Sequence, residues 1–352
     1  MRSPALKKTG KRVLQIGLPI AILLFFANQV HQTWNGLTSH SFQWNPWLLT
    51  LSFLGFILQE LSFGIIWQTV LARLGYRVDF RVSLRIYLAS EFVRYIPGNV
   101  WHVLTRILWV GKYGVPRPIA FASMTIELIT KLASAALIFA ISLLFWHNVA
   151  AVGSLFQSPL IPALAGVSIL ALLVLLHPRI LNGLLNVALG VLKRDPVVLT
   201  LRYSDILLVT LAWCLSWIIA GSAFYLLLLA LRPDTTLAML PICIGIYAIA
   251  WDVGFVAFIT PSGLGFREGA IGGLFVLALP FPAAIGAILA LLSRFVSTMA
   301  ELLCVGAAYL IGRRQVREVR QEQTPVSKDQ AEDTMNNESI APVSVEGGAG
   351  SE

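Results

Sequence analysis

Long apolar runs separated by short polar stretches set the pattern of this chain. Six of these runs continue for about 18 residues or more with few charged side chains, and at about 1.5 Å per residue each can cross a hydrocarbon layer roughly 30 Å thick. They cover residues 13–30, 47–72, 119–146, 158–177, 205–231 and 284–312. The pattern predicts an all-α, polytopic membrane protein whose first run is a retained anchor rather than a cleaved signal.

Two further apolar segments, at about 80–111 and 237–280, are interrupted by proline and glycine. The first contains "RYIPGNVWHVLTR" and the second contains "FITPSGLGFREG". A single proline kink in a transmembrane helix often serves packing alone. Because the two breaks occupy matching places and an arginine follows each, we expect each segment to form a re-entrant hairpin. The total is then about eight transmembrane segments.

The order of runs and breaks repeats along the chain. Residues 13–146 and 158–312 each contain two uninterrupted runs, one broken segment and one final run. The first half begins on one side of the membrane and the second begins on the other, so the order predicts two inverted repeats. Broken segments at matching places in inverted halves indicate a binding site of the kind found in transporters.

The distribution of positive charge predicts the orientation in the membrane. The net charge is +8, and the lysines and arginines gather in alternate loops. This asymmetry predicts that both termini lie in the cytoplasm, and it removes the need for a nucleic-acid partner to explain the charge. We expect a basic N-terminus at 1–12, a single membrane domain at 13–312 and a polar, disordered tail at 313–352.

Apart from Arg81, Arg85 and Asp205 near the segment ends, eleven charged side chains fall inside the apolar segments. A charge at the centre of a bilayer costs about 2.5–3.5 kcal/mol on insertion scales, so most of these side chains must pair with one another or line water. The set comprises Arg94, Arg106, Lys131, Arg267, Arg294, Glu60, Glu91, Glu127, Asp252, Glu268 and Glu301. Helical spacing favours ion pairs between Glu91 and Arg94 and between Glu127 and Lys131.

Arg106 and Arg267 each follow one of the breaks, where a new half-helix would begin. Apart from Glu268, which adjoins Arg267, no opposite charge lies at helical spacing on their own segments. Free backbone N–H groups and the helix dipole favour an anion at such a place, and arginine offers a planar fork that matches phosphate. We therefore expect two opposed hairpin tips to present guanidinium groups to one polar chamber that receives a lipid phosphate.

Other kinds of chemistry have little support in the sequence. The three cysteines lie in apolar runs, and the five histidines are scattered. We find neither the paired spacing of metal ligands nor a Gly-x-x-x-x-Gly-Lys-Ser/Thr loop for nucleotide phosphates. The sequence predicts no metal and no cofactor.

Two motifs resemble a known family, the transmembrane region of lysylphosphatidylglycerol synthase, also called the flippase-like membrane family. The stronger motif is "PSGLGFREGAIGGLFVLALPFPAAIGAILALLSRF" at 261–295, which is similar to the family's Pro, Gly-Leu-Gly, Arg-Glu and Arg pattern. The looser motif runs from "YIPGNVWHVLTRILWVGKYGV" to "SMTIELITK" in the first half. The resemblance extends over about residues 50–312.

The resemblance implies a lipid-handling protein. Bifunctional members carry a soluble synthase domain after the membrane part, whereas here we expect a stand-alone member because only about forty residues follow. Stand-alone members are associated with phospholipids, polyprenyl-linked lipids or hopanoid-type lipids, and the resemblance does not choose among them. The substrate-binding positions that the resemblance implies are Pro97, Gly98, Arg106, Glu127, Pro261, Gly263, Gly265, Arg267, Glu268 and Arg294. To these we add Lys131, the cation in the span that follows the first break.

Three functions remain open at this point. The leading one is a translocator of an anionic or phosphate-bearing lipid in the bacterial inner membrane, which works by alternating access with the head group held by Arg106 and Arg267. The second is an integral membrane enzyme acting on lipid-linked glycan, aminoacyl-lipid or hopanoid synthesis. The third is a non-transporting partner of a glycosyltransferase or lipid synthase. The oligomeric state has no signature in the sequence.

Overall fold

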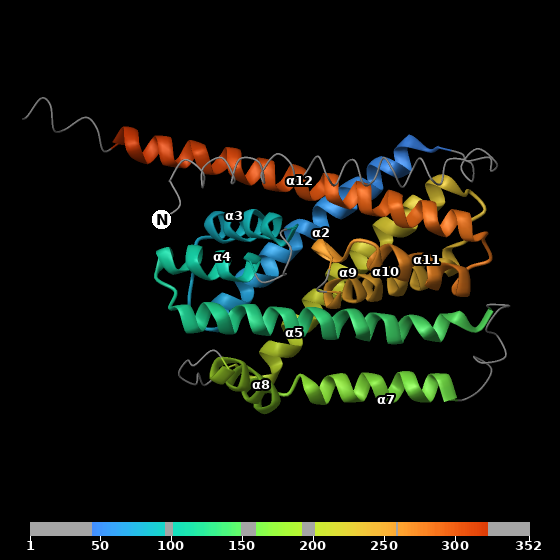
Figure 1. Ribbon diagram of the computed structural model, residues 1–352, viewed down its shortest axis with the longest axis horizontal. Helices are drawn as coiled ribbons and strands as arrows, with labels where there is room; N and C mark the ends of the chain where they lie inside the picture. The colour runs from blue at the N-terminus through green and yellow to red at the C-terminus, as the bar shows by residue number, and fades with distance from the viewer. Residues whose placement is uncertain (1–43, 96–100, 149–159, 192–200, 258–259, 323–352) are drawn as a thin grey trace, which may run out of the picture. The chain divides into compact units, whose positions relative to one another are not determined.

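The computed structural model describes residues 44–95, 101–148, 160–191, 201–257 and 260–322 (Figure 1). All regular secondary structure in these residues is helical, which confirms the all-α class. The elements are α2 (Pro46–Arg73), α3 (Phe80–Glu91), η1 (Phe92–Tyr95), α4 (Trp101–Val110), η2 (Gly111–Tyr113), α5 (Arg117–Ser142), η3 (Leu143–Asn148), α7 (Leu160–Leu175), α8 (Pro178–Val191), α9 (Tyr203–Leu231), η4 (Leu237–Met239), α10 (Leu240–Val256), η5 (Pro261–Gly263), α11 (Phe266–Ala278) and α12 (Ala283–Glu322).

Five helical segments within the described residues are long and apolar enough to cross a membrane. They are Pro46–Arg73, Arg117–Trp146, Tyr203–Leu231, Leu237–Val256 and Ala283–Leu310, and the bent pair α7 and α8 would make a sixth. The chain is therefore a multi-pass membrane protein. The predicted first span at 13–30 lies outside the described residues, and the count of eight and the inverted repeats stay predictions.

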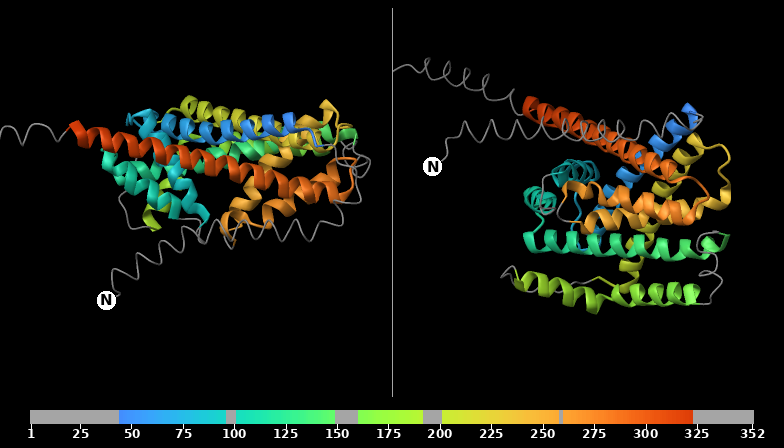
Figure 2. Two further views of the ribbon diagram at one scale, coloured as in Figure 1. Left: turned by 90° about the horizontal axis from the view of Figure 1, so that it is seen from above. Right: turned by 45° about the vertical axis from the view of Figure 1, so that its right-hand side comes forward.

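Both broken segments consist of two helices joined at the predicted break. In the first, α3 has 12 residues and α4 has 10, so at about 1.5 Å per residue neither reaches across roughly 30 Å of hydrocarbon. In the second, α10 has 17 residues and α11 has 13, and the two pack side by side (Figure 2). Both segments thus contain two α-helices, but the helices of the second segment are longer.

The segment 178–191, expected as part of a loop, is instead the helix α8. Pro178 stands at its first position, where the missing N–H costs nothing. Leu181, Leu185 and Leu189 recur every fourth residue and are buried, so one apolar face holds the helix in place. The span predicted at 158–177 ends just before Pro178, where a second helix begins that is bent by 67° from α7.

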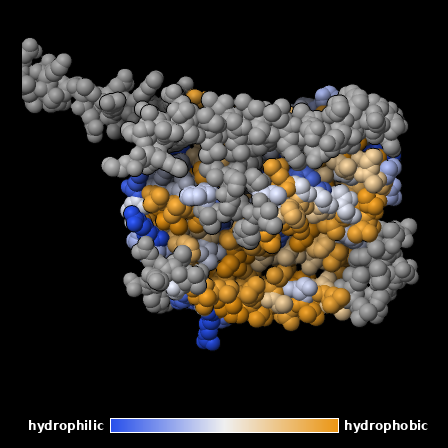
Figure 3. Space-filling view, viewed as in Figure 1, coloured by the Kyte–Doolittle hydropathy of each residue, from blue (hydrophilic) through white to orange (hydrophobic). Residues whose placement is uncertain are grey.

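The helix α7 shows what kind of surface faces the lipid. It lies beside α5 (Figures 1 and 2), and Leu164, Val167, Leu170 and Val174 are exposed along one side of it. Apolar residues cover this part of the molecule (Figure 3). A water-soluble protein would bury such a stripe, whereas acyl chains solvate it at no cost.

Contacts divide the chain into two compact units, Met1–Gly306 and Ala307–Glu352. The cavity and its neighbours described below all belong to the first unit. The helix α12 continues to Glu322, beyond the expected end of the membrane domain at residue 312, so the first ten residues of the predicted disordered tail are helical. The rest of that tail lies outside the described residues.

Small residues let α10 pack closely against α9 and α5, its neighbours in the core. A Cβ on Gly221 of α9 would lie 2.3 Å from the Ile244 Cα of α10. A Cβ on Gly245 of α10 would lie 1.9 Å from the Ser142 hydroxyl oxygen of α5. Because these residues have small side chains, the helix backbones come into direct van der Waals contact, as is usual between membrane helices.

We expect Gly221→Ala to destabilise the protein because the new methyl group must displace the backbone of α10. Overpacking of this kind costs about 1–3 kcal/mol. Gly183→Ala is the matched control, since Gly183 in α8 has open space around its Cα and alanine is the better helix former. Thermal unfolding in detergent measures both, and a Gly221→Ala midpoint equal to that of Gly183→Ala would contradict the packing described here.

Candidate functional site

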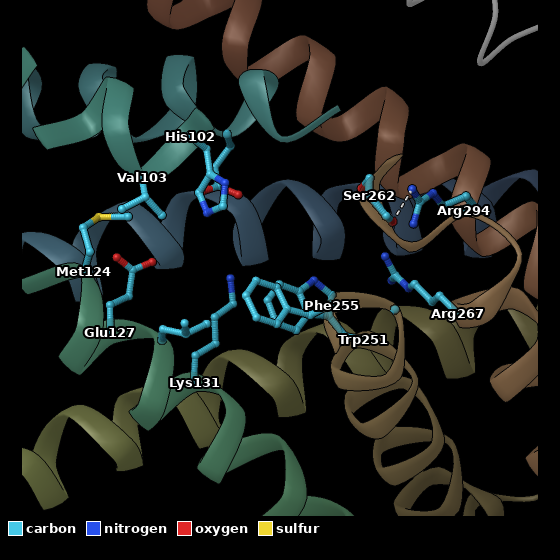
Figure 4. Close-up of a pocket in the computed structure, with 13 residues that line it drawn as sticks. His102, Val103, Met124, Glu127, Lys131, Trp251, Phe255, Ser262, Arg267 and Arg294 are labelled. Atoms are coloured by element: carbon cyan, nitrogen blue, oxygen red, sulfur yellow. Dashed lines mark hydrogen bonds between the residues drawn. The ribbon is translucent and has the colours of Figure 1, made fainter. Parts of the chain in front are cut away.

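A cavity of about 220 Å³ opens where the two broken segments meet α5 and α12 (Figure 4). Liquid water occupies about 30 Å³ per molecule, so the space corresponds to roughly seven waters or one small polar group. Its lining mixes charged and apolar side chains: Glu91, His102, Val103, Met124, Glu127, Leu128, Lys131, Trp251, Gly254, Phe255, Ser262, Arg267 and Arg294.

Arg267 enters the cavity from the first turn of α11. Its side chain is buried, and its guanidinium carbon lies 4.7 Å from the centre of the Tyr247 ring. Within the described part of the chain, its Nε and Nη2 atoms have no hydrogen-bond partner. A buried guanidinium with unused donors is costly, and an anion in the cavity would satisfy them.

The break in the second hairpin positions Arg267. Gly265 caps α11 with φ +87°, a backbone conformation that L side chains rarely adopt. Gly263 has φ +68°, and a Cβ there would lie 2.3 Å from the Gly254 carbonyl oxygen of α10. A Cβ on Gly254 would in turn lie 3.0 Å from the Arg267 Cβ. These glycines allow the turn at Ser262, which also has a positive φ, to sit directly on α10.

Arg294 of α12 and Glu268 of α11 form hydrogen bonds with the backbone of the turn at residues 262–265. The Arg294 Nη2 donates to the Ser262 carbonyl oxygen at 3.0 Å, and its Nε lies 3.7 Å from the Glu268 Oε1. The Glu268 Oε2 accepts from the Gly265 N–H at 2.7 Å, which completes the cap of α11. Arg294 therefore holds the turn while its side chain lines the cavity.

Lys131 reaches the cavity from α5 and ends among aromatic rings. Its ammonium nitrogen lies 3.8 Å from the centre of the Phe63 ring, 4.1 Å from Trp251 and 4.9 Å from Trp213. Cations are attracted to the faces of such rings, most strongly where water is excluded. Lys131 is almost fully buried, so the ammonium is held within the protein and not at its surface.

Arg106 does not present free donors to the cavity, which corrects the expectation for the first hairpin. Its guanidinium forms ion pairs with Glu91 and with Glu127, the latter at 2.7 Å, and its Nε donates to Ser90 at 2.9 Å. The Tyr87 ring lies 3.9 Å below it. The carboxylates line the cavity in place of the arginine.

Helical spacing alone could not reveal these partners. We expected Glu91 to pair with Arg94, whose side chain lies outside the described residues, and Glu127 to pair with Lys131. Both Glu91 and Glu127 form ion pairs with Arg106, since α3, α4 and α5 converge there, and Glu127 also interacts electrostatically with Lys131. Pro97 and Gly98 also lie outside the described residues, and of Pro261 only the backbone is described.

A second, smaller polar cavity adjoins the first and shares Trp251, Arg267 and Arg294 with it. Its remaining lining is Gln59, Glu60, Tyr247, Ser297, Thr298 and Glu301. Four of the six carboxylates noted in the sequence, Glu60, Glu91, Glu127 and Glu301, thus border one of the two cavities. Within the described ranges, no cluster of three or more His, Cys, Asp or Glu side chains is arranged to hold a metal ion.

The helices and this buried polar site define a multi-pass membrane protein with a charged chamber inside. Comparison with known families identifies it further: the model of the lysylphosphatidylglycerol synthase TM region matches residues 13–304. The chain belongs to this family, as the motifs around the two breaks indicated. A comparison with curated proteins found no match.

The ion-pair cluster around Arg106 leads to a prediction about stability. Arg106→Ala would remove the cation that forms ion pairs with two buried carboxylates, a change that typically costs about 3–5 kcal/mol. Arg73→Ala is the control, because Arg73 pairs with Asp205 at a partly exposed position, where a pair is worth about 0–1 kcal/mol. Unfolding in detergent should show a much larger loss for Arg106→Ala, and equal losses would mean that the cluster does not stabilise the fold.

Proposed function

We propose that this protein translocates an anionic or phosphate-bearing lipid across the bacterial inner membrane. The single observation that carries the proposal is the buried, unused pair of donors on Arg267, which points into a cavity at the meeting of the two broken segments. Membership of the family supports the coarser statement that the chain handles lipid.

The charges around the cavity favour an anionic guest. Lys131, Arg267 and Arg294 all line it from different helices. Of the two carboxylates that line it, Glu91 and Glu127, each is already engaged by Arg106. A phosphate group at the unused donors of Arg267 would receive charge-assisted hydrogen bonds, which are about twice as strong as neutral ones, and Lys131 and Arg294 would add positive charge nearby.

The size of the cavity favours a lipid over a soluble solute. Sites for whole small molecules usually measure about 300–1,000 Å³, whereas this cavity has about 220 Å³. A head group fits this space if the acyl chains remain outside in the bilayer. The apolar side chains of Val103, Met124 and Leu128 in the lining suit the glycerol end of such a lipid.

Reconstitution into liposomes with acyl-labelled phosphatidylglycerol tests the proposal. The wild-type protein should equalise the label between leaflets. Arg267→Ala should slow this at least about tenfold, because a hydrogen bond from a charged group is worth about 1.5–3 kcal/mol. The control is Arg179→Ala, at an exposed arginine on α8 outside the cavity lining.

Two other outcomes would overturn the proposal. Chemical conversion of the lipid in detergent, without any bilayer, would support the enzyme alternative. A purified, folded protein that leaves the label in its original leaflet would support the role of an accessory partner of a lipid synthase or glycosyltransferase.

The proposed orientation, with both termini cytoplasmic, has its own test. The three native cysteines, Cys214, Cys243 and Cys304, are buried, so they give a low labelling background. Thr236→Cys, before α10, should react with an impermeant maleimide added to intact cells made permeable only in the outer membrane. Lys112→Cys, after α4, should react only after lysis, and the reverse result would invert the topology.

A further inference from the structure

Lys131 occupies a three-sided aromatic cage, formed by Phe63 of α2, Trp213 of α9 and Trp251 of α10. The ammonium nitrogen lies between 3.8 and 4.9 Å from all three ring centres. Figure 4 shows the side chain extending from α5 toward the Trp251 indole at the wall of the cavity. Three ring faces around one cationic group are a known way to recognise alkylammonium ligands.

The rings of the cage pack against one another and against Phe255. Phe63 and Trp213 lie 5.0 Å apart, and Trp251 stacks on Phe255 with an interplanar angle of 9°. Phe63 and Trp213 are almost fully buried. The cage is therefore a preformed site for a cation, and the chain's own lysine fills it.

A lipid head group that entered the cavity would meet this lysine. Trp251, Lys131 and Arg267 line the same space, so a phosphate on Arg267 would have its substituent close to the cage. An ethanolamine substituent carries a primary ammonium, the same chemical group as the end of lysine. It would find the cage occupied and a like charge beside it, whereas a glycerol substituent brings no charge.

We propose that Lys131 determines head-group specificity: it is a built-in occupant of the aromatic cage that excludes ammonium-bearing lipids and admits phosphate lipids without an amine. This inference rests on the proposed lipid translocation and names the substrate class of that site.

Acidic groups around the cage show what removal of the lysine would leave. Asp252 of α10 interacts electrostatically with Lys131, and its Oδ1 has no hydrogen-bond partner within the described residues. Glu127 lies one turn before Lys131 on α5. With the lysine removed, three ring faces and a nearby carboxylate would form a site for the ammonium of a phospholipid.

The experiment compares two lipids that differ in the head group alone. Phosphatidylglycerol and phosphatidylethanolamine, both labelled on an acyl chain, are followed across liposome membranes containing wild-type or variant protein. The wild type should move phosphatidylglycerol at least about tenfold faster than phosphatidylethanolamine. Lys131→Ala should raise the rate for phosphatidylethanolamine relative to phosphatidylglycerol by at least about tenfold.

Two further variants separate the cage from a simple loss of positive charge. Lys131→Arg keeps a cation among the rings and should still exclude phosphatidylethanolamine. Phe63→Leu combined with Lys131→Ala removes one wall of the cage and should cancel most of the gained ethanolamine transport. Thermal unfolding and gel filtration check that each variant folds, and Lys131→Gln, which keeps most of the side-chain volume, replaces Lys131→Ala if the latter does not.

Failure of the inference is distinct from failure of the proposed function. A wild-type protein that moves neither lipid overturns both. A wild type that moves both lipids equally leaves translocation intact and overturns the role of Lys131. An unchanged ratio of the two rates in folded Lys131→Ala or Lys131→Gln also overturns it.

Discussion

The cost of holding charge away from bulk water governs the interior of this protein. Arg106, almost entirely buried, is stable there because Glu91, Glu127 and Ser90 satisfy its donors and the Tyr87 ring lies against it. These partners come from α3 and α5, so the arginine on α4 ties three helices together. This cluster helps to hold the first broken segment beside the core, and the cavity wall next to it is carboxylate and not guanidinium.

Much of the fold could be predicted because a membrane span has a local signature. The runs expected at 47–72, 205–231 and 284–312 correspond to α2, α9 and α12, since twenty apolar residues in sequence have few alternatives to a spanning helix. The helix α8 was not predicted because it begins with Pro178 and contains Arg179, and proline and basic residues are also common in loops. Only the spacing of its buried leucines indicated a helix.

The candidate site could be predicted in part. Arg267 was expected beside a break and Lys131 and Arg294 in the spans that follow the breaks, and the structure brings all three to one cavity. The role of Arg106 could not be foreseen, because its ionic partners lie 15 and 21 residues away on other helices. The cage around Lys131 was equally hidden, since Phe63 and Trp213 stand in apolar runs where an aromatic residue is ordinarily part of the core.

The contact between Gly254 and Gly263 has a mechanical consequence. With no side chain between them, the backbone of the turn at η5 rests on the backbone of α10, and the next contact along passes to the Cβ of Arg267. No flexible side chain lies between the two backbones at this contact, so a movement of one cannot be taken up by a change of rotamer. The tip of the second hairpin and the C-terminal end of α10 therefore behave as one rigid unit, which fixes the spacing between Trp251 and Arg267.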